Sequence, residues 1–175
     1  MKPLLFALLA VPCVALAQYD PLGKSRFNTN YEEPEAWKEA EVTDLPAFPK
    51  PENLTAIYVS PVATNTYLID GSTLTVAADN VVRYVLVVRT SGGAQNISFE
   101  GMHCKEGKWK TYATGRSDST WSKARISEWR PIENKPVNRH HAALSKDFFC
   151  PNGSNILAAD EGRNALRLGK HPNVN

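Results

Sequence analysis

The chain has 175 residues, 42% of them hydrophobic, and its 20 basic and 18 acidic side chains give a formal net charge of +2 at pH 7. This length suits one globular domain that buries a core of its own. Nucleic-acid-binding proteins need a marked basic excess to neutralise phosphates, so the near-balance of charge excludes a nucleic-acid partner.

Residues 1–17 are predicted to be a secretory signal peptide. They begin with the positively charged Lys2, continue with an almost wholly apolar run at 4–16, and offer small residues for cleavage after Ala17. This run is too short to cross a hydrocarbon core of about 30 Å, and no later run approaches that length. We therefore expect a periplasmic or secreted cell-envelope protein with no transmembrane segment after cleavage. The alternatives are a retained N-terminal anchor or helix, and lipidation at Cys13, although a proline precedes that cysteine.

Cysteine counting predicts one disulfide. Removal of the leader takes Cys13 with it and leaves Cys104 and Cys150. An exported chain meets an oxidising compartment, where an even pair of cysteines favours a bond. The chain-entropy account gives such a bond about 4 kcal/mol of stabilisation. Two free thiols are the competing interpretation.

The next segment, residues 18–53, is predicted to be an extended N-terminal arm. It is acidic and then rich in proline, which favours extended, polyproline-like backbone. A short helix is expected at 35–41 and disorder at 18–30. Three apolar side chains would be wasted on a free linker, so we expect the arm to lie partly against the domain. These side chains are Trp37, Leu45 and Phe48.

A single domain is predicted over 54–169, and its first half, 54–115, has the pattern of an antiparallel meander. The longest β-branched run, 81–90, alternates an apolar face with a mixed face that includes Arg83 and Arg89. Such a strand is expected at the centre of a sheet, with the apolar face on the core. Turn-forming dipeptides separate the runs; they are Asp70-Gly71, Asp79-Asn80 and Gly92-Gly93.

The second half of the domain changes character. A helical turn is expected at 117–125, extended structure at 127–132, a helix opening at Asn138, and a last short helix before a frayed tail at 170–175. Together the elements predict an α+β fold. In it, an antiparallel sheet of about five or six strands carries one or two helices on one face.

His103 and Cys104 stand side by side near the end of a predicted strand, which raises the question of a metal or thiol site. Neighbouring residues of a strand point to opposite faces, so the two side chains do not easily share one metal ion. A bond to Cys150 leaves no thiolate at Cys104 for nucleophilic chemistry. His103 falls on the more apolar face, where a hydrogen-bonded core or edge residue is expected.

No catalytic, metal or cofactor site is predicted elsewhere. His140 and His141 diverge by about 100 degrees on the expected helix, without the i, i+4 spacing of helical zinc ligands. One of them is expected to face solvent and the other to be half-buried. Glu100 is expected to pair with Arg83 or Arg89 across the sheet. The chain also lacks the G-x-S-x-G, P-loop and G-x-G-x-x-G signatures.

An aromatic and basic set is the strongest candidate for a ligand or partner surface. Its members are Trp109, Tyr112, Trp121, Arg125 and Trp129. The partner expected there is an envelope protein or polymer. The alternative is a structural role, in which these aromatic rings close the sheet onto its helix.

Several stretches, in this order, resemble the CNP1-like family of exported proteobacterial proteins: "EAWKEAEVTDLPAFPKPENL", "VVRYVLVVRTSGGAQNISFEGMHC", "KTYATG", "WSKARISEWRPI" and "DFFCP". The resemblance covers nearly the whole chain after the leader. That family has no established activity, so the resemblance implies no catalytic residues. More remotely, the order of strands, cysteines and a W-x-x-I segment is similar to small envelope proteins of the surface-adhesin E type, which implies binding rather than catalysis.

The sequence therefore predicts a non-catalytic binding or protein-interaction module of the cell envelope, without cofactor or metal. The alternatives are an envelope hydrolase that acts on cell-wall or glycan material, and a structural factor in envelope assembly. A deep pocket that gathers Glu100, Arg83 or the histidines would favour the enzyme. A flat or apolar groove would favour binding.

Overall fold

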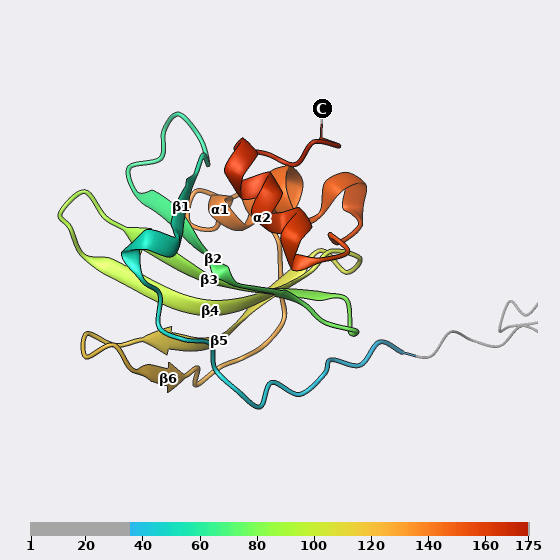
Figure 1. Ribbon diagram of the computed structural model, residues 1–175, viewed down its shortest axis with the longest axis horizontal. Helices are drawn as coiled ribbons and strands as arrows, with labels where there is room; N and C mark the ends of the chain where they lie inside the picture. Colours follow the sequence, from blue (N-terminus) through green and yellow to red (C-terminus); the bar gives the residue numbers. More distant parts are fainter. Residues whose placement is uncertain (1–35, 175) are drawn as a thin grey trace, which may run out of the picture. The chain divides into compact units, whose positions relative to one another are not determined.

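The computed structural model describes residues 36–174, so the predicted leader and the predicted disorder at 18–30 lie outside the described residues. Strands that follow one another along the chain pair antiparallel from β1 to β6, and β7 pairs with β5 (Figure 1). The predicted antiparallel sheet is confirmed. The strands are β1 (Leu54–Ile57), β2 (Thr66–Val76), β3 (Val81–Arg89), β4 (Gln95–His103), β5 (Lys108–Gly115), β6 (Trp121–Lys123) and β7 (Arg130–Pro131).

The helices α1 and α2 lie on one face of this sheet, as Figure 1 shows. α2 is followed directly by Gly169, whose φ of 80° is the left-handed conformation that ends many helices. No helix in the described part of the chain is long and apolar enough to cross a bilayer. The predicted α+β class is confirmed. The helical segments are η1 (Pro51–Asn53), α1 (Arg139–Ala143), the π-helical η2 (Leu144–Phe149), η3 (Pro151–Gly153) and α2 (Ala159–Leu168).

The main core lies between the sheet and these helices, on what we call the helix face. Alternation along β3 points Val82, Tyr84 and Leu86 toward the helices. They belong to one apolar cluster with Phe148 and Phe149 of η2, and all five side chains are at most 1% exposed. Burial of large apolar groups of this kind supplies most of the free energy that favours folding.

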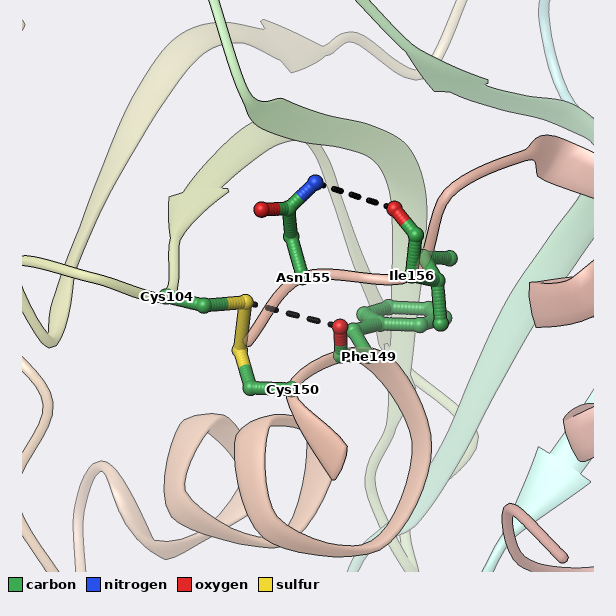
Figure 2. The surroundings of a disulfide bond; sticks show 5 residues. All are labelled: Cys104, Phe149, Cys150, Asn155 and Ile156. Atoms are coloured by element: carbon green, nitrogen blue, oxygen red, sulfur yellow. Dashed lines mark hydrogen bonds between the residues drawn. A yellow bond between two sulfur atoms is a disulfide. The ribbon is translucent and has the colours of Figure 1, made fainter. Parts of the chain in front are cut away.

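A disulfide joins the end of β4 to the end of η2 and so closes one edge of this core (Figure 2). The bond links Cys104 to Cys150, whose Cα atoms are 5.4 Å apart, and the predicted pairing is confirmed. Cys104 Sγ also contacts the carbonyl oxygen of Phe149 at 3.4 Å. That contact involves no shared proton, because the sulfur is oxidised.

The opposite face of the sheet, which we call the arm face, is covered by part of the arm. Residues 37–48, the docked segment, cross this face on the side away from the helices and do not join the sheet as a strand (Figure 1). Val42 and Leu45 of the docked segment pack against the buried Val85 and Phe99. The arm-face residues that matter below are Arg83, Val85, Phe99, His103, Lys110 and Tyr112.

Two local helix predictions are wrong, because side chains satisfy the backbone there in other ways. Residues 36–41 form no helix, and the N–H of Ala40 donates instead to Asp79 Oδ2 at 2.8 Å. The region 117–125 holds a turn, stabilised by hydrogen bonds to Asp118, and then β6. An aspartate that accepts hydrogen bonds from residues just after it favours a turn as readily as a helix start.

The predicted frayed tail at 170–175 differs from the structure at His171. This side chain is 2% exposed, and its backbone N–H donates to the carbonyl oxygen of Asp147 at 2.7 Å. Its Nε2 also lies 2.9 Å from Glu161 Oε1 of α2. The polar contacts of one histidine therefore hold the chain against the domain past the end of α2.

Candidate functional site

The carboxylate of Glu39, in the docked segment, is received by three side chains of the domain. Lys110 Nζ and Trp129 Nε1 donate to Oε2 at 2.9 and 3.0 Å, and Tyr112 Oη donates to Oε1 at 2.7 Å. Lys110 and Tyr112 are alternate residues of β5 and reach the same face of the sheet. Trp129 precedes β7, which pairs with the start of β5. Together they make a carboxylate receptor of one cation and two neutral donors in hydrogen-bond contact, and Arg83 Nη2 adds a second positive charge 4.0 Å from Oε1.

The charge state of this receptor suits a bound anion at neutral pH. Burial would raise the pKa of Glu39, but the hydrogen bonds from Lys110, Tyr112 and Trp129 lower it below its ordinary value. Burial, and then the hydrogen bond to Glu39, raise the pKa of Tyr112, so the phenol keeps the proton that it donates. Charge-assisted hydrogen bonds of this kind are about twice as strong as neutral ones.

A buried ion pair at the β2–β3 turn holds the backbone beside Glu39. Asp79 Oδ2 accepts from Arg83 at 2.6 Å and from the N–H of Ala40, and the carbonyl oxygen of Asp79 accepts from Trp37 Nε1 at 2.7 Å. Burial would raise the pKa of Asp79, but the hydrogen bonds from Arg83 and Ala40 lower it. The ion pair therefore stays charged and fixes the docked segment next to the receptor.

The indole ring of Trp37 stacks on the imidazole ring of His103. The two ring centroids are 4.3 Å apart with the planes inclined by 25°, and Trp129 meets Trp37 edge-on at 5.4 Å. His103 is 2% exposed, and burial lowers its pKa. Its Nδ1 has no hydrogen-bond partner within residues 36–174. His103 is thus a buried residue, but it acts by stacking and not through the hydrogen bond that was expected.

The far end of the docked segment is held by Trp121. Its Nε1 donates to the carbonyl oxygen of Pro46 at 2.9 Å, and its ring centroid lies 5.3 Å from that of Phe48. Gly115 is required beneath this contact, because a Cβ there would come within 2.8 Å of Ile97 Cβ and 3.0 Å of Phe48 Cε2. The tryptophan N–H thus donates to a backbone carbonyl, a group that any extended polypeptide presents.

The docked segment does not fill the arm face. A hollow of about 350 Å³ lies between residues 40–46 and the sheet, where Thr75 and Phe99 line it. A second hollow, of about 260 Å³, opens beside Lys110 and Tyr112. Larger side chains than those of the docked segment therefore have room on this face.

The structure brings together three of the five residues predicted to form a partner surface. Tyr112, Trp121 and Trp129 all bind the docked segment, so the predicted surface already holds a polypeptide, namely the chain's own arm. The other two predicted residues lie apart from this contact. Arg125 is exposed on the chain that follows β6.

Trp109 does not belong to that surface. It is 7% exposed, lies on the helix face, and stacks on His141 with a centroid distance of 3.5 Å. The reason is strand alternation, because Trp109 is the immediate neighbour of Lys110 in β5 and points the other way. For Trp109, the structural role that was the alternative is the correct one.

Sequence reasoning missed the residues that the arm and the β2–β3 turn contribute. These are Trp37 and Glu39 of the docked segment, and Asp79 and Arg83 of the turn and β3. One signal was available: an aromatic residue two positions before a glutamate, in a segment whose apolar residues already indicated docking. In extended backbone, residues two apart point the same way.

On the helix face, Glu100 forms a buried polar cluster and not the predicted pair with Arg83 or Arg89. Its Oε2 lies 2.9 Å from His141 Nε2 and accepts from Tyr84 Oη at 3.1 Å. Glu100 stands opposite Tyr84 in the β3–β4 register and so shares the helix face, whereas Arg83 points to the arm face. Burial would raise the pKa of Glu100, but the hydrogen bond to His141 lowers it.

His140 and His141 are both buried, at 9% and 2% exposed, so the expected solvent-facing histidine is wrong. Their ring centroids are 4.0 Å apart, and His140 also stacks on Tyr67 at 4.9 Å. Burial lowers the pKa of His140 to about 4. Among the described residues, no three His, Cys, Asp or Glu side chains are placed to hold a metal ion. The cluster is buried, and Glu100 within it is 4% exposed.

A third hollow, of about 420 Å³, opens between the β1–β2 loop and the segment before α1. Its rim carries the exposed Val62 and Val137. Arg139, in its wall, donates to Asn134 and Ser60 and so is held by the wall itself. These polar groups bind each other, whereas the donors on the arm face meet at one carboxylate.

Two comparisons with known proteins bear on this geometry. The profile of the CNP1-like family matches residues 32–167. Cryptic neisserial protein 1 of Neisseria gonorrhoeae is 29% identical over 99 residues, which cover 49% of this chain and 48% of that protein. The chain therefore spans about half the length of this curated relative. No solved structure matches the chain.

Proposed function

The chain belongs to the CNP1-like family, and from that premise we propose that it is an exported, non-catalytic binding module of the cell envelope. Its ligand is an extended acidic segment of another envelope protein, and its binding site is the arm face. The observation that carries the proposal is the carboxylate receptor formed by Lys110, Tyr112 and Trp129 around Glu39.

The features of this face are those of sites that recognise extended peptides. Such sites combine aromatic rings, which give contact area, with a few groups that donate hydrogen bonds to backbone carbonyls. These hydrogen bonds fix the position of the peptide along the site. Trp121 supplies an N–H that donates to a backbone carbonyl, and Lys110 supplies the positive charge for an acidic side chain. The rival carboxylate–imidazole pair, Glu100 and His141, is enclosed on the other face, which argues for binding over hydrolysis.

Crosslinking in the cells that produce the protein tests this function. A photoreactive amino acid is placed at Thr75, which is exposed and lines the larger hollow on the arm face. The matched control places it at Arg167, which is exposed on α2 over the helix face. We expect protease-sensitive adducts in the envelope fraction from position 75 only. We also expect a second change, Lys110→Ala, to reduce those adducts at least five-fold.

Three outcomes would contradict the proposal. Equal adducts from the two positions would indicate non-specific contact. Adducts that persist unchanged without Lys110 would separate the partner from the carboxylate receptor. Recovery of the chain in the cytosol with its leader intact would contradict the proposed export to the cell envelope. Conversely, turnover of a cell-wall substrate that is lost on replacement of His141 would favour the hydrolase.

A further inference from the structure

Resting on this proposed function, we infer that the docked segment is a built-in competitor for the same site. The arm face is a receptor for an external acidic polypeptide that carries an aromatic residue two positions before a glutamate, and residues 37–48 must leave before that ligand binds. The chain thus carries both the receptor and an occupant that keeps it closed.

The way in which the docked segment is held makes it removable. No residue of 37–48 joins the sheet as a strand, so the pairing of β2 to β5 does not depend on it. Its hydrogen bonds run mainly to side chains, as between Ala40 and Asp79 or Pro46 and Trp121. Segments with few backbone ladders and few buried apolar contacts open locally at low free-energy cost, while the rest of a domain stays folded.

The fit of the docked segment is also incomplete. Trp37 is 37% exposed although it lies on His103, and the open hollow of about 350 Å³ is lined both by residues 40–46 and by the sheet. Within the described residues, the buried apolar cluster under the docked segment consists of Val85, Phe99 and Ala113. A ligand with larger apolar side chains opposite that hollow would bury more surface than the arm does, and would therefore displace it.

The receptor specifies what such a ligand must carry. Residues two apart on an extended chain point the same way, so Trp37 reaches His103 while Glu39 reaches Lys110. A ligand therefore needs an aromatic residue, any residue and then a glutamate. Glutamine in place of the glutamate loses the charge that faces Lys110, and keeps the shape.

The arm competes at high effective concentration because it is tethered. A short tether presents a bound segment at about millimolar concentration. The apparent dissociation constant of an external ligand is the intrinsic constant divided by the fraction of molecules with an open site. Changes that loosen the arm without touching the receptor must therefore strengthen binding of the ligand, which a purely structural arm would not do.

A labelled peptide of residues 36–48 (AWKEAEVTDLPAF) tests this competition directly, since it is a ligand known to fit. Fluorescence anisotropy measures its binding to the full mature chain in three forms. These are the unchanged chain, the arm-loosened variant W37A/E39Q, and the same variant with Lys110→Ala. We expect the arm-loosened variant to bind the peptide at least ten-fold more tightly than the unchanged chain, and K110A to reverse that gain at least ten-fold.

The peptide supplies its own matched control. A version with glutamine at the position of Glu39 differs by one charge, and we expect it to bind the arm-loosened variant at least five-fold more weakly. Circular dichroism and the mass of the oxidised protein establish that each variant keeps its sheet and its Cys104–Cys150 bond. These measurements separate loss of the receptor from loss of the fold.

Two results would overturn the inference. Equal affinity for the unchanged and loosened chains would show that the arm is no competitor. Formation of a one-to-one complex between unchanged and loosened chains, tighter than the peptide complex, would make a second copy the occupant. Either result leaves the crosslinking from Thr75 intact. If the crosslinking fails while the peptide binds as expected, the arm face is confirmed as a peptide receptor, and the proposal of an envelope partner is refuted.

Discussion

The two faces of the sheet differ in what holds their covers in place. The helix face is buried and mostly apolar around one enclosed polar cluster, with Tyr84, Phe148 and Phe149 at most 1% exposed and a covalent bond across its edge. The arm face holds an irregular segment through charged and aromatic side chains, among them Lys110 and Trp129. Alternate residues of the same strands therefore have different roles. Those on the helix face stabilise the fold, and those on the arm face are expected to make a reversible contact.

The largest expected effect on stability comes from removing one phenyl ring from each face and comparing the two losses. Phe149→Ala removes a fully buried side chain that packs on Tyr84, and should lower the free energy of unfolding by about 3–5 kcal/mol. Phe48→Ala removes a half-buried ring from the arm and should cost about 1 kcal/mol or less. Urea titration followed by circular dichroism measures both. Similar losses for the two variants would contradict the division of tasks.

The disulfide should give the next largest effect, and on the helix face alone. It links residues 46 apart in sequence, so C104A/C150A should cost about 4 kcal/mol in the free energy of unfolding through the greater freedom of the unfolded chain. Urea titration of the oxidised, the reduced and the double-alanine proteins measures it. Binding of the 36–48 peptide in non-denaturing buffer is the control. A change in peptide affinity with the fold intact would mean that the two faces are coupled.

Much of the fold was predictable because its signals are local. Two of the predicted turn-forming dipeptides, Asp79-Asn80 and Gly92-Gly93, do separate strands. The turn predicted at Asp70-Gly71 is wrong, because β2 continues through it with a shift in its register to β3. The pair of cysteines that remains after removal of the predicted leader predicted the Cys104–Cys150 bond, which the structure confirms. Alternation also predicts the placement of two aromatic residues of β5. Trp109 and Tyr112 are three residues apart on one strand, so they belong on opposite faces, and the structure separates them.

The receptor itself was not predictable, because its parts are distant in sequence. Glu39 meets Lys110 and Tyr112 across 71 and 73 residues, and Trp129 across 90. No local propensity encodes contacts at such separations. The burial of both His140 and His141 also depends on residues distant in sequence. Tyr67 of β2 stacks on His140, and Trp109 of β5 stacks on His141. Tertiary packing overrode the expectation from helix geometry alone.

Acidic pH should weaken the helix face through His140. Its pKa is about 4 in the folded protein, whereas an unfolded histidine has a pKa of about 6.5. Below about pH 6.5 the unfolded chain therefore binds a proton that the folded chain does not. The stability due to this group is present above pH 6.5 and falls between about pH 6.5 and 4, by up to about 3 kcal/mol.

The change His140→Phe isolates that contribution, because phenylalanine keeps a ring against Tyr67 and has no proton to bind. We expect the variant to lose less stability than the unchanged protein between pH 7 and pH 4.5, as measured by urea titration at each pH. The lowered pKa values of Glu39 and Asp79 also remove stability as pH falls, and they remain in both proteins. Burial would raise the pKa of Glu100, which stays lowered mainly by its hydrogen bond to His141, and His140 is a lesser cause. Parallel pH curves for the two proteins would refute the assignment to His140.

The smallest expected effect on stability should be the most informative about the arm face. Glu39→Gln removes the charge that Lys110 faces, and should change the free energy of global unfolding by less than about 1 kcal/mol, because the docked segment opens before the sheet unfolds. Local opening should increase at the same time. The N–H of Ala40, which donates to Asp79, should exchange with deuterium about ten-fold faster, while amides of β3 keep their protection. Loss of several kcal/mol from this one change would instead make the arm an integral part of the core, because a segment that can be released does not carry the stability of the sheet beneath it.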